Sequence, residues 1–332
     1  MSRIQKYNES LQRFIKDKSC LFEDQSNKNL ELSEYIYNQI QNNDLIFSIL
    51  LLTVLNNQNK KNRVSMQGYY IASSIEFMNI LLHIIENKQD VINQFDQDTY
   101  IKLYSNLMIY TNKSLQQNLE SIKNVYNIQH QSFIGNILTS LNLYNETFLT
   151  LNHFSDFRLN ITNKNCHNSI IKWYLKDNDE LIEKFKKFKQ IKKESLQEYI
   201  GKRYIVLCEL AVSIALIIGG GYQIKDNSKI KKVAKYFAIM YKMAKDFENL
   251  DNDIKNNEKY TSNYILNFGL QEGYEIFLNN KQKFIEESMI EEIYTTTIKE
   301  IIDVIEINVD MIIDQTSPDL KSSYSSAPVL SH

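Results

Sequence analysis

Proline is almost absent from this sequence. Only Pro318 and Pro328 occur among its 332 residues, and glycine occurs eight times. Proline breaks helix interiors and glycine weakens them, so their scarcity permits long helices from residue 1 to residue 317. No alternating strand pattern or hairpin signal emerges. The sequence therefore predicts an all-α protein.

The sequence also has few cysteines and a small net charge. Cys20, Cys166 and Cys208 lie far apart and form no C-x-x-C pair, which argues against a disulfide framework and a zinc site. We expect buried free thiols instead. The net charge of −2 supplies no general field for attracting nucleic acid, so we expect no nucleic-acid partner.

Long hydrophobic runs are missing as well. The first residues, MSRIQKYNESLQRF, lack the apolar core of a secretory signal. The apolar run at 45–55 is too short to span a membrane, and the run at 206–221 is interrupted by Glu209 and ends in three glycines. We expect no transmembrane span.

Helical periodicity dominates what is present. The predicted helices cover residues 4–17, 30–42, 44–56, 66–90, 98–125, 131–156, 167–190, 194–218, 228–250, 270–287 and 289–314. We expect a single helical domain over residues 1–313, with a charged surface insertion at about 177–194. The polar residues 314–332 form an expected C-terminal tail.

Three of the predicted helices are mostly apolar but carry polar residues at spacings of three and four, which places those residues on one face. On the helix at 66–90 they are Glu76, Asn79, His83, Glu86 and Asp90. On the helix at 228–250 they are Lys242, Lys245, Asp246, Asn249 and Asp253, and on the helix at 194–218 they are Ser195, Glu198, Lys202, Glu209 and Ser213. A bundle with a polar interior channel accounts for these stripes; equally, the side chains satisfy one another or face solvent.

Residues 74–90, SIEFMNILLHIIENKQD, resemble the first aspartate-rich region of the polyprenyl synthases, which reads E-x-x-H and then, after apolar residues, H-D-D-x-x-D. Glu76 matches the glutamate, and Asn79 replaces the histidine. The DDxxD positions are occupied by Glu86-Asn87-Lys88-Gln89-Asp90.

Residues 241–249, YKMAKDFEN, resemble the second motif of that family, F-Q-x-x-D-D-x-x-D. Asp246 matches the second aspartate, whereas Lys245 and Asn249 replace the other two. Lys202 matches a lysine that contacts the diphosphate. The basic G-G-K-x-x-R-P element has no counterpart, because its best position, residues 42–47, keeps none of the basic groups.

The resemblance implies an isoprenoid-synthase-like bundle of about ten or more helices around a central cavity. In that family six carboxylates hold the Mg²⁺ ions that stabilise a departing diphosphate. Glu86, Asp90 and Asp246 are three of the six, and they would be the metal ligands of an active enzyme. Lys245 adds a positive charge among them, and we expect it to pair with Asp246 or Asp90. We therefore expect no cofactor, or Mg²⁺ only if activity survives.

The resemblance and the eroded motifs together suggest a non-catalytic or accessory subunit. It would form a homo- or heterodimer through long helices, or join a larger complex. Long-chain members of the family are associated with quinone synthesis, so the resemblance implies a mitochondrial location. The alternative is the cytoplasm. Three alternatives stay open: an active, divergent prenyl diphosphate synthase, an unrelated helical scaffold, and a binder of lipid or quinone tails.

Overall fold

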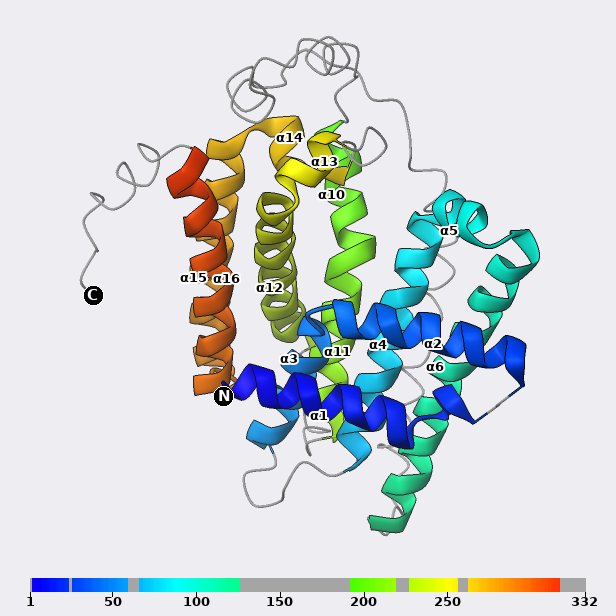
Figure 1. Cartoon of the computed structure of the whole chain (residues 1–332). Coiled ribbons are helices and arrows are strands. Elements are labelled where there is room, and N and C mark those ends of the chain that lie inside the picture. The colour runs from blue at the N-terminus through cyan, green and yellow to red at the C-terminus, as the bar shows by residue number, and fades with distance from the viewer. Residues whose placement is uncertain are drawn as a thin grey trace.

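The computed structural model describes residues 2–23, 26–58, 66–125, 192–218, 227–255 and 262–316. Within these ranges the regular structure is helical, and none of it is a strand (Figure 1). The predicted fold class is confirmed. The predicted helices at 131–156 and 167–190, Cys166, most of the 177–194 insertion and the tail beyond residue 316 lie outside the described residues.

The N-terminal half contains α1 (Arg3–Lys18), η1 (Cys20–Phe22), α2 (Asn27–Asn42), α3 (Ile46–Gln58), α4 (Met66–Glu86), α5 (Lys88–Gln94) and α6 (Gln97–Val125). The C-terminal half contains α10 (Lys193–Ile200), η3 (Gly201–Ile205), α11 (Val206–Ile218), α12 (Asn227–Glu248), α13 (Leu250–Lys255), α14 (Tyr264–Phe268), α15 (Leu270–Ile290) and α16 (Thr296–Thr316). Helices α1, α2, α3, α6, α12 and α15 begin and end within about three residues of a predicted helix. The helix predicted at 289–314 begins instead at Thr296, and the short helices α13 and α14 were not predicted.

Helices α4, α11, α12, α15 and α16 run roughly side by side (Figure 1). Helices α1 and α2 run transverse to them and both contact α4. The closest packing is between α4 and α6, between α12 and α15, and between α3 and α11. The start of α1 lies at the start of α16, where the Arg3 backbone N–H donates to Glu300 Oε1 at 3.0 Å. These contacts bring both ends of the described chain onto the same bundle.

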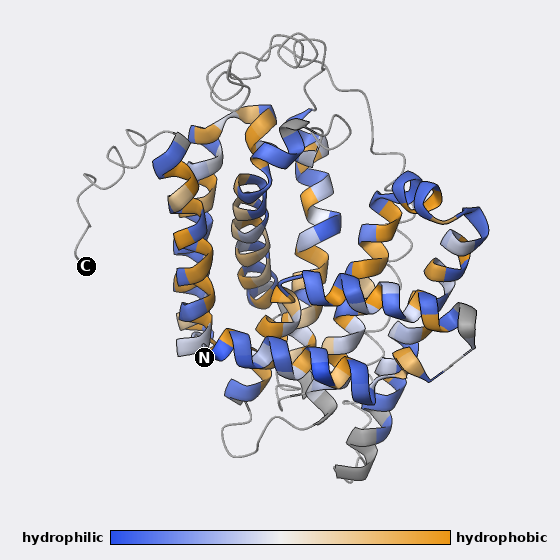
Figure 2. Ribbon diagram, viewed as in Figure 1, coloured by the Kyte–Doolittle hydropathy of each residue, from blue (hydrophilic) through white to orange (hydrophobic). Residues whose placement is uncertain are grey.

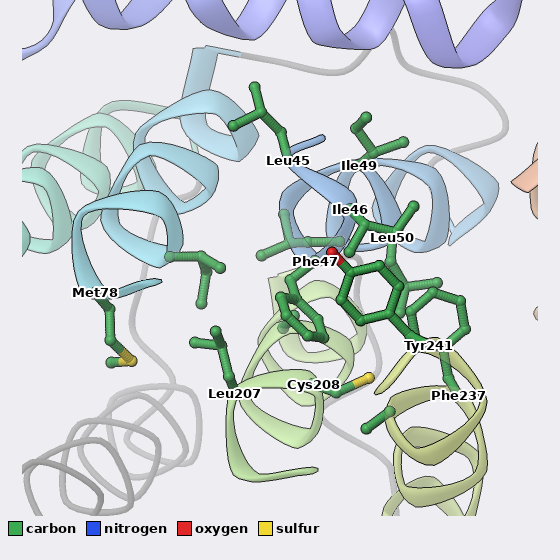
Figure 3. Close-up of a cluster of buried hydrophobic side chains, with 14 of the residues drawn as sticks. Leu45, Ile46, Phe47, Ile49, Leu50, Met78, Leu207, Cys208, Phe237 and Tyr241 are labelled. Atoms are coloured by element: carbon green, nitrogen blue, oxygen red, sulfur yellow. The ribbon is translucent and has the colours of Figure 1, made fainter. Parts of the chain in front are cut away.

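The core lies where α3, α4, α11 and α12 meet (Figure 3). The α3 sequence, IFSILLLTVLNNQ, is apolar around most of its circumference, and a helix of that kind is buried. Phe47 of α3 packs edge-on against Tyr241 of α12, with ring centroids 5.4 Å apart. The peripheral helix α1 is amphipathic and buries only Leu11, Phe14 and Ile15, and its remaining residues are mostly hydrophilic (Figure 2).

One helical stretch among the described residues, Gly68–Glu86, is long and apolar enough to cross a membrane. The sequence analysis did not single it out. Most of this stretch is buried inside the protein, as expected for the central helix of a globular bundle. Two of the three cysteines, Cys20 and Cys208, are buried free thiols, as predicted.

The predicted helix at 66–90 is interrupted, which is a correction. Helix α4 ends at Glu86 and α5 begins at Lys88, with Asn87 between them at φ −107° and ψ 31°. The Asn87 side chain donates to the His83 carbonyl at 2.8 Å, and such local bonds compete with helix continuation. Glu86 and Asp90 therefore stand on different helices rather than on one continuous face.

The segment from Lys193 to Ile218 contains a π-helical turn, Gly201–Ile205, between α10 and α11. A π-turn accommodates one more residue than an α-turn and rotates the side chains within it. Arg203 is buried in this turn, whereas its neighbour Lys202 remains partly exposed. The sequence analysis singled out Lys202 and not Arg203.

We expect Phe284→Ala to lower the free energy of unfolding by about 3–5 kcal/mol, because it opens a cavity in a close-packed core. Phe284 is fully buried, and its ring centroid lies 5.0 Å from that of Phe237. Met289→Ala on the same helix is the control, since Met289 is exposed. Its effect in urea unfolding should stay within about 0.5 kcal/mol, and equal losses in the two variants would contradict the placement of this core.

Candidate functional site

The last residue of α4, Glu86, forms a partly buried ion pair with the π-turn, in which the side chains of Arg203 and Glu86 are 8% and 21% exposed. Its Oε1 accepts from Arg203 Nε at 3.1 Å and from the Tyr199 hydroxyl at 2.8 Å. Burial lowers the pKa of Arg203, but Glu86 and two neighbouring tyrosines more than offset this and raise the pKa above its ordinary value. The guanidinium therefore stays charged and neutralises Glu86.

The polar stripe of α4 continues inward from this pair. Arg203 Nη1 donates to Asn79 Oδ1 at 3.0 Å, and Asn79 follows Glu76 by three residues on the same helix face. Glu76 is fully buried and also accepts from the Ser48 hydroxyl. The other carboxyl oxygen of Glu76, Oε2, has no partner among the described residues. Burial raises the pKa of Glu76 to about 7, although Ser48 and Asn79 lower it.

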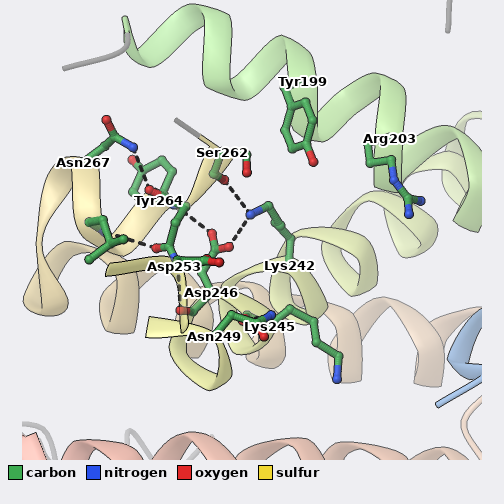
Figure 4. Close-up of polar contacts among 12 residues, drawn as sticks. Tyr199, Arg203, Lys242, Lys245, Asp246, Asn249, Asp253, Ser262, Tyr264 and Asn267 are labelled. Carbon is green, nitrogen blue, oxygen red and sulfur yellow. Dashed lines mark hydrogen bonds and ion pairs between the residues drawn. The ribbon is translucent and has the colours of Figure 1, made fainter. Parts of the chain in front are cut away.

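A second buried ion pair joins Lys242 and Asp246 on α12 (Figure 4). Their side chains are only 3% and 5% exposed. The Lys242 ammonium donates to Asp246 Oδ1 and, at 2.7 Å, to the Ser262 carbonyl. Burial raises the pKa of Asp246 to about 6 against the opposing effect of Lys242, so this carboxylate is ionised at neutral pH.

Asp246 also organises the turn that leads into α14. Its Oδ2 accepts from the Tyr264 backbone N–H at 2.8 Å. The Asn263 side chain donates to the Asp246 carbonyl and to Asp253 Oδ2, each at 2.9 Å. Every polar contact that the structure gives to the Asp246 side chain is thus with another part of the protein.

The prediction that Lys245 pairs with Asp246 or Asp90 is wrong. Lys245 is turned away from Asp246 (Figure 4) and contacts Asp44 Oδ2 at 2.9 Å and Glu248 Oε2 at 2.6 Å. The reason is helical geometry: Lys242 precedes Asp246 by four residues and shares its inner face, whereas Lys245 is rotated by about 100°. Asp44 lies in the loop between α2 and α3.

The other predicted residues are spread around these pairs. Lys202 pairs with Glu198 at 2.7 Å on the partly exposed side of the π-turn. Asn249 is exposed and donates to the Lys245 carbonyl at 2.9 Å. Asp90 is exposed in the first turn of α5. The structure therefore does not gather Glu86, Asp90 and Asp246 into one carboxylate cluster.

These residues do not fit a magnesium centre. Mg²⁺ requires near-octahedral coordination by oxygens, usually one or two carboxylates together with water and phosphate. Nowhere in the described ranges do three or more His, Cys, Asp or Glu side chains come together as metal ligands would. Glu86 and Asp246 each pair with a side-chain cation of the protein.

Sequence reasoning missed the central roles of Arg203, Tyr199 and Asp44. A usable signal existed for Lys242, because Lys242 and Asp246 have the i,i+4 spacing of a helical ion pair. No residue pattern predicted the role of Arg203, because its contact with Glu86 is made from within the π-turn. The sequence analysis noted that residues 42–47 lack basic groups, but it did not consider the negative charge of Asp44.

No protein-family model matches this chain, and neither does any curated protein sequence. Solved structures do match it. The geranyltransferase from Legionella pneumophila is 12% identical with a TM-score of 0.57, over 93% of this chain and 96% of that one.

Two further solved structures agree. The Helicobacter pylori geranyltransferase, complexed with magnesium and isoprenyl diphosphate, is 12% identical with a TM-score of 0.54, over 95% of this chain and 97% of that one. A geranylgeranyl pyrophosphate synthetase from the archaeon Geoglobus acetivorans is 10% identical with a TM-score of 0.53, over 92% and 97%. These similarities establish the isoprenoid synthase fold.

We expect stability to depend on pH through Glu76. A carboxyl group whose pKa rises from 4.5 unfolded to about 7 folded binds its proton more tightly in the folded state. Its contribution is therefore fully present below pH 4.5 and is lost as pH rises through 7, by up to about 3 kcal/mol. Glu76→Gln should remove this loss and raise the urea midpoint at pH 8 relative to the native chain.

The control is Asp90→Asn, because Asp90 is exposed and should leave the pH profile unchanged. If Glu76→Gln and the native chain lose stability equally between pH 5 and pH 8, Glu76 is not the group responsible.

We expect Arg203→Met to cost about 3–5 kcal/mol of stability, because it leaves the Glu86 carboxylate without its buried cation. Adding Glu86→Gln to that variant should recover part of the loss, as a double-mutant cycle measured by urea unfolding would show. Lys202→Met tests the neighbouring exposed pair and should change stability by less than about 1 kcal/mol. Strict additivity of Arg203→Met and Glu86→Gln would refute the pairing.

Proposed function

We propose that this chain, which has the isoprenoid synthase fold, is a non-catalytic subunit of an oligomeric assembly. One observation carries the proposal: Glu86 and Asp246, which match metal ligands of the polyprenyl synthases, are bonded to Arg203 and Lys242 of the chain itself. The fold is retained, and its two inward carboxylates serve to hold helices together.

A side-chain cation does not replace a magnesium ion in this chemistry. A metal ion binds protein carboxylates and diphosphate oxygens at once, and so stabilises the charge that develops on the leaving group. The Lys242 ammonium donates hydrogen bonds to Asp246 and to the Ser262 carbonyl. Arg203 is likewise directed at Glu86 and Asn79. Both cations are buried, and their N–H groups donate to acceptors of the protein itself.

The charges are also reversed at the opposite side of the site. The resemblance places a basic, diphosphate-binding element at residues 42–47, and this chain has Asp44 there. Asp44 accepts from the Tyr241 hydroxyl at 2.8 Å and pairs with Lys245 at 2.9 Å. These contacts tie the loop between α2 and α3 directly to α12. A carboxylate at this position repels a diphosphate rather than binding it.

The adjacent Leu45 has a positive φ of 52°, which is unfavourable for a branched side chain. Such a conformation persists when the surroundings enforce it. Here Leu45 is buried and Asp44 accepts from Tyr241 of α12, so contacts with the rest of the protein hold the loop in this arrangement. This supports a structural role for a segment that would otherwise bind substrate.

A subunit role requires a protein partner. A homo- or heterodimer through long helices, membership of a larger complex and a mitochondrial location all remain predictions from the resemblance. Light scattering of the purified chain should give a mass above that of one chain, either alone or with its partner. A strict monomer that co-purifies with nothing would contradict the subunit role.

We expect the purified chain to show no condensation of allylic and homoallylic diphosphates with excess Mg²⁺. The Lys245→Asp/Asn249→Asp variant should stay inactive, because Arg203 and Lys242 still neutralise Glu86 and Asp246. An active prenyl diphosphate synthase assayed in parallel provides the positive control. Turnover by the native chain that disappears in Asp246→Asn would overturn the proposal and make Asp246 a functional metal ligand.

A further inference from the structure

Helix α16 has an apolar face that no described part of the protein covers. Val304, Ile307 and Met311 are 47%, 57% and 56% exposed. Their spacing of three and four residues places them in one row along the helix. Most of the large apolar side chains that are exposed in the described residues belong to α15 and α16.

This row is separate from the face that α16 contributes to the core. The buried residues on the inner face are Ile298, Ile301, Ile302, Ile305, Val309 and Ile313, and α16 packs there against α12, α1 and α3. A helix that is apolar on two sides is normally buried on both. The exposed row therefore points to a contact outside the described fold, since single scattered apolar residues would not form a line.

Acidic residues accompany the row. Helix α16 contains Glu300, Asp303, Glu306, Asp310 and Asp314 but only one basic residue, Lys299, so its formal charge is 1 − 5 = −4. Helical geometry puts Asp303, Asp310 and Asp314 along one flank of the apolar row. Asp310 also accepts from the Tyr274 hydroxyl of α15 at 3.2 Å, which fixes its position beside the row.

We propose that this face of α16 binds an amphipathic helix of another protein, in which lysines or arginines flank the apolar side. The inference deepens the proposed function, on which it rests, by naming the kind of partner and the surface that receives it. Apolar side chains of the partner would cover Val304, Ile307 and Met311, and its basic residues would meet the acidic flank.

The charges decide between possible occupants. A second copy of α16 would bring two acidic flanks together, which is unfavourable even though Lys281 neutralises Glu306 on each helix. An anionic membrane surface would be repelled for the same reason. Only a basic occupant satisfies both the apolar row and its acidic flank.

The first measurement uses the full chain and a synthetic helical peptide of about 18 residues, with leucines on one face and lysines on both flanks. Fluorescence anisotropy should show binding that weakens as salt rises from about 50 mM to about 300 mM. A control peptide with glutamate in place of every lysine should not bind. No binding of the lysine peptide, or equal binding of both peptides, would overturn the inference.

Variants then locate the contact. The affinity for the lysine peptide should fall by about tenfold or more in Ile307→Glu, and likewise in the double variant Asp303→Lys/Asp314→Lys. Ile101→Glu is the matched control, because Ile101 is similarly exposed on α6 and should leave binding unchanged. Equal weakening in the Ile101 control would show that the peptide binds elsewhere.

A third measurement identifies an occupant from the same chain. If residues 177–194 or 317–332 cover this face, Ile307→Glu should lower the melting temperature of the isolated chain clearly more than Ile101→Glu does. That outcome would overturn the inference. Peptide binding is independent of the condensation assay, so an active enzyme would refute the proposed function without changing this result.

Discussion

The constraint on which the rest of the site depends is that a buried carboxylate must be neutralised. Helix α12 carries Asp246 into the interior, and α4 ends at the half-buried Glu86; an unpaired charge in such surroundings is costly. The chain supplies both counter-charges itself, Arg203 from the π-turn and Lys242 from one turn earlier on α12. Around them, Tyr199, Asn79, Ser262 and Tyr264 satisfy the remaining donors and acceptors.

These pairs connect elements that are distant in sequence. Arg203 links the π-turn to α4, Lys242 and Asp246 link α12 to the turn before α14, and Asp44 links the loop before α3 to α12. In this chain the polar groups of these elements bond to one another. This arrangement supports a structural role, and the apolar row on α16 gives that role a surface.

Most of the fold could be predicted from the sequence, because scarce proline and strong 3.6-residue periodicity leave few alternatives to a helical bundle. The polar stripes were assigned only in part: Asp246 is buried and Asn79 and Glu86 are half-buried, whereas Asp90 stands on a separate helix and Lys245 pairs with Asp44 instead of Asp246. The predictions that failed concern single turns of helix. Helix α4 ends where the Asn87 side chain bonds to the His83 carbonyl, and in the π-turn it is Arg203, not Lys202, that is buried. Both effects depend on one-residue changes in helical phase, which residue spacing alone does not reveal.

The account stands on the claim that Glu86 and Asp246 are neutralised by the protein and do not bind metal. The most direct test is a titration of the purified chain with Mn²⁺ in the presence of inorganic diphosphate, followed by electron paramagnetic resonance of the free ion. The account predicts that the native chain and the Glu86→Gln/Asp246→Asn variant give the same curve. Saturable binding by the native chain that this variant loses would contradict it, because both carboxylates would then be available to a metal.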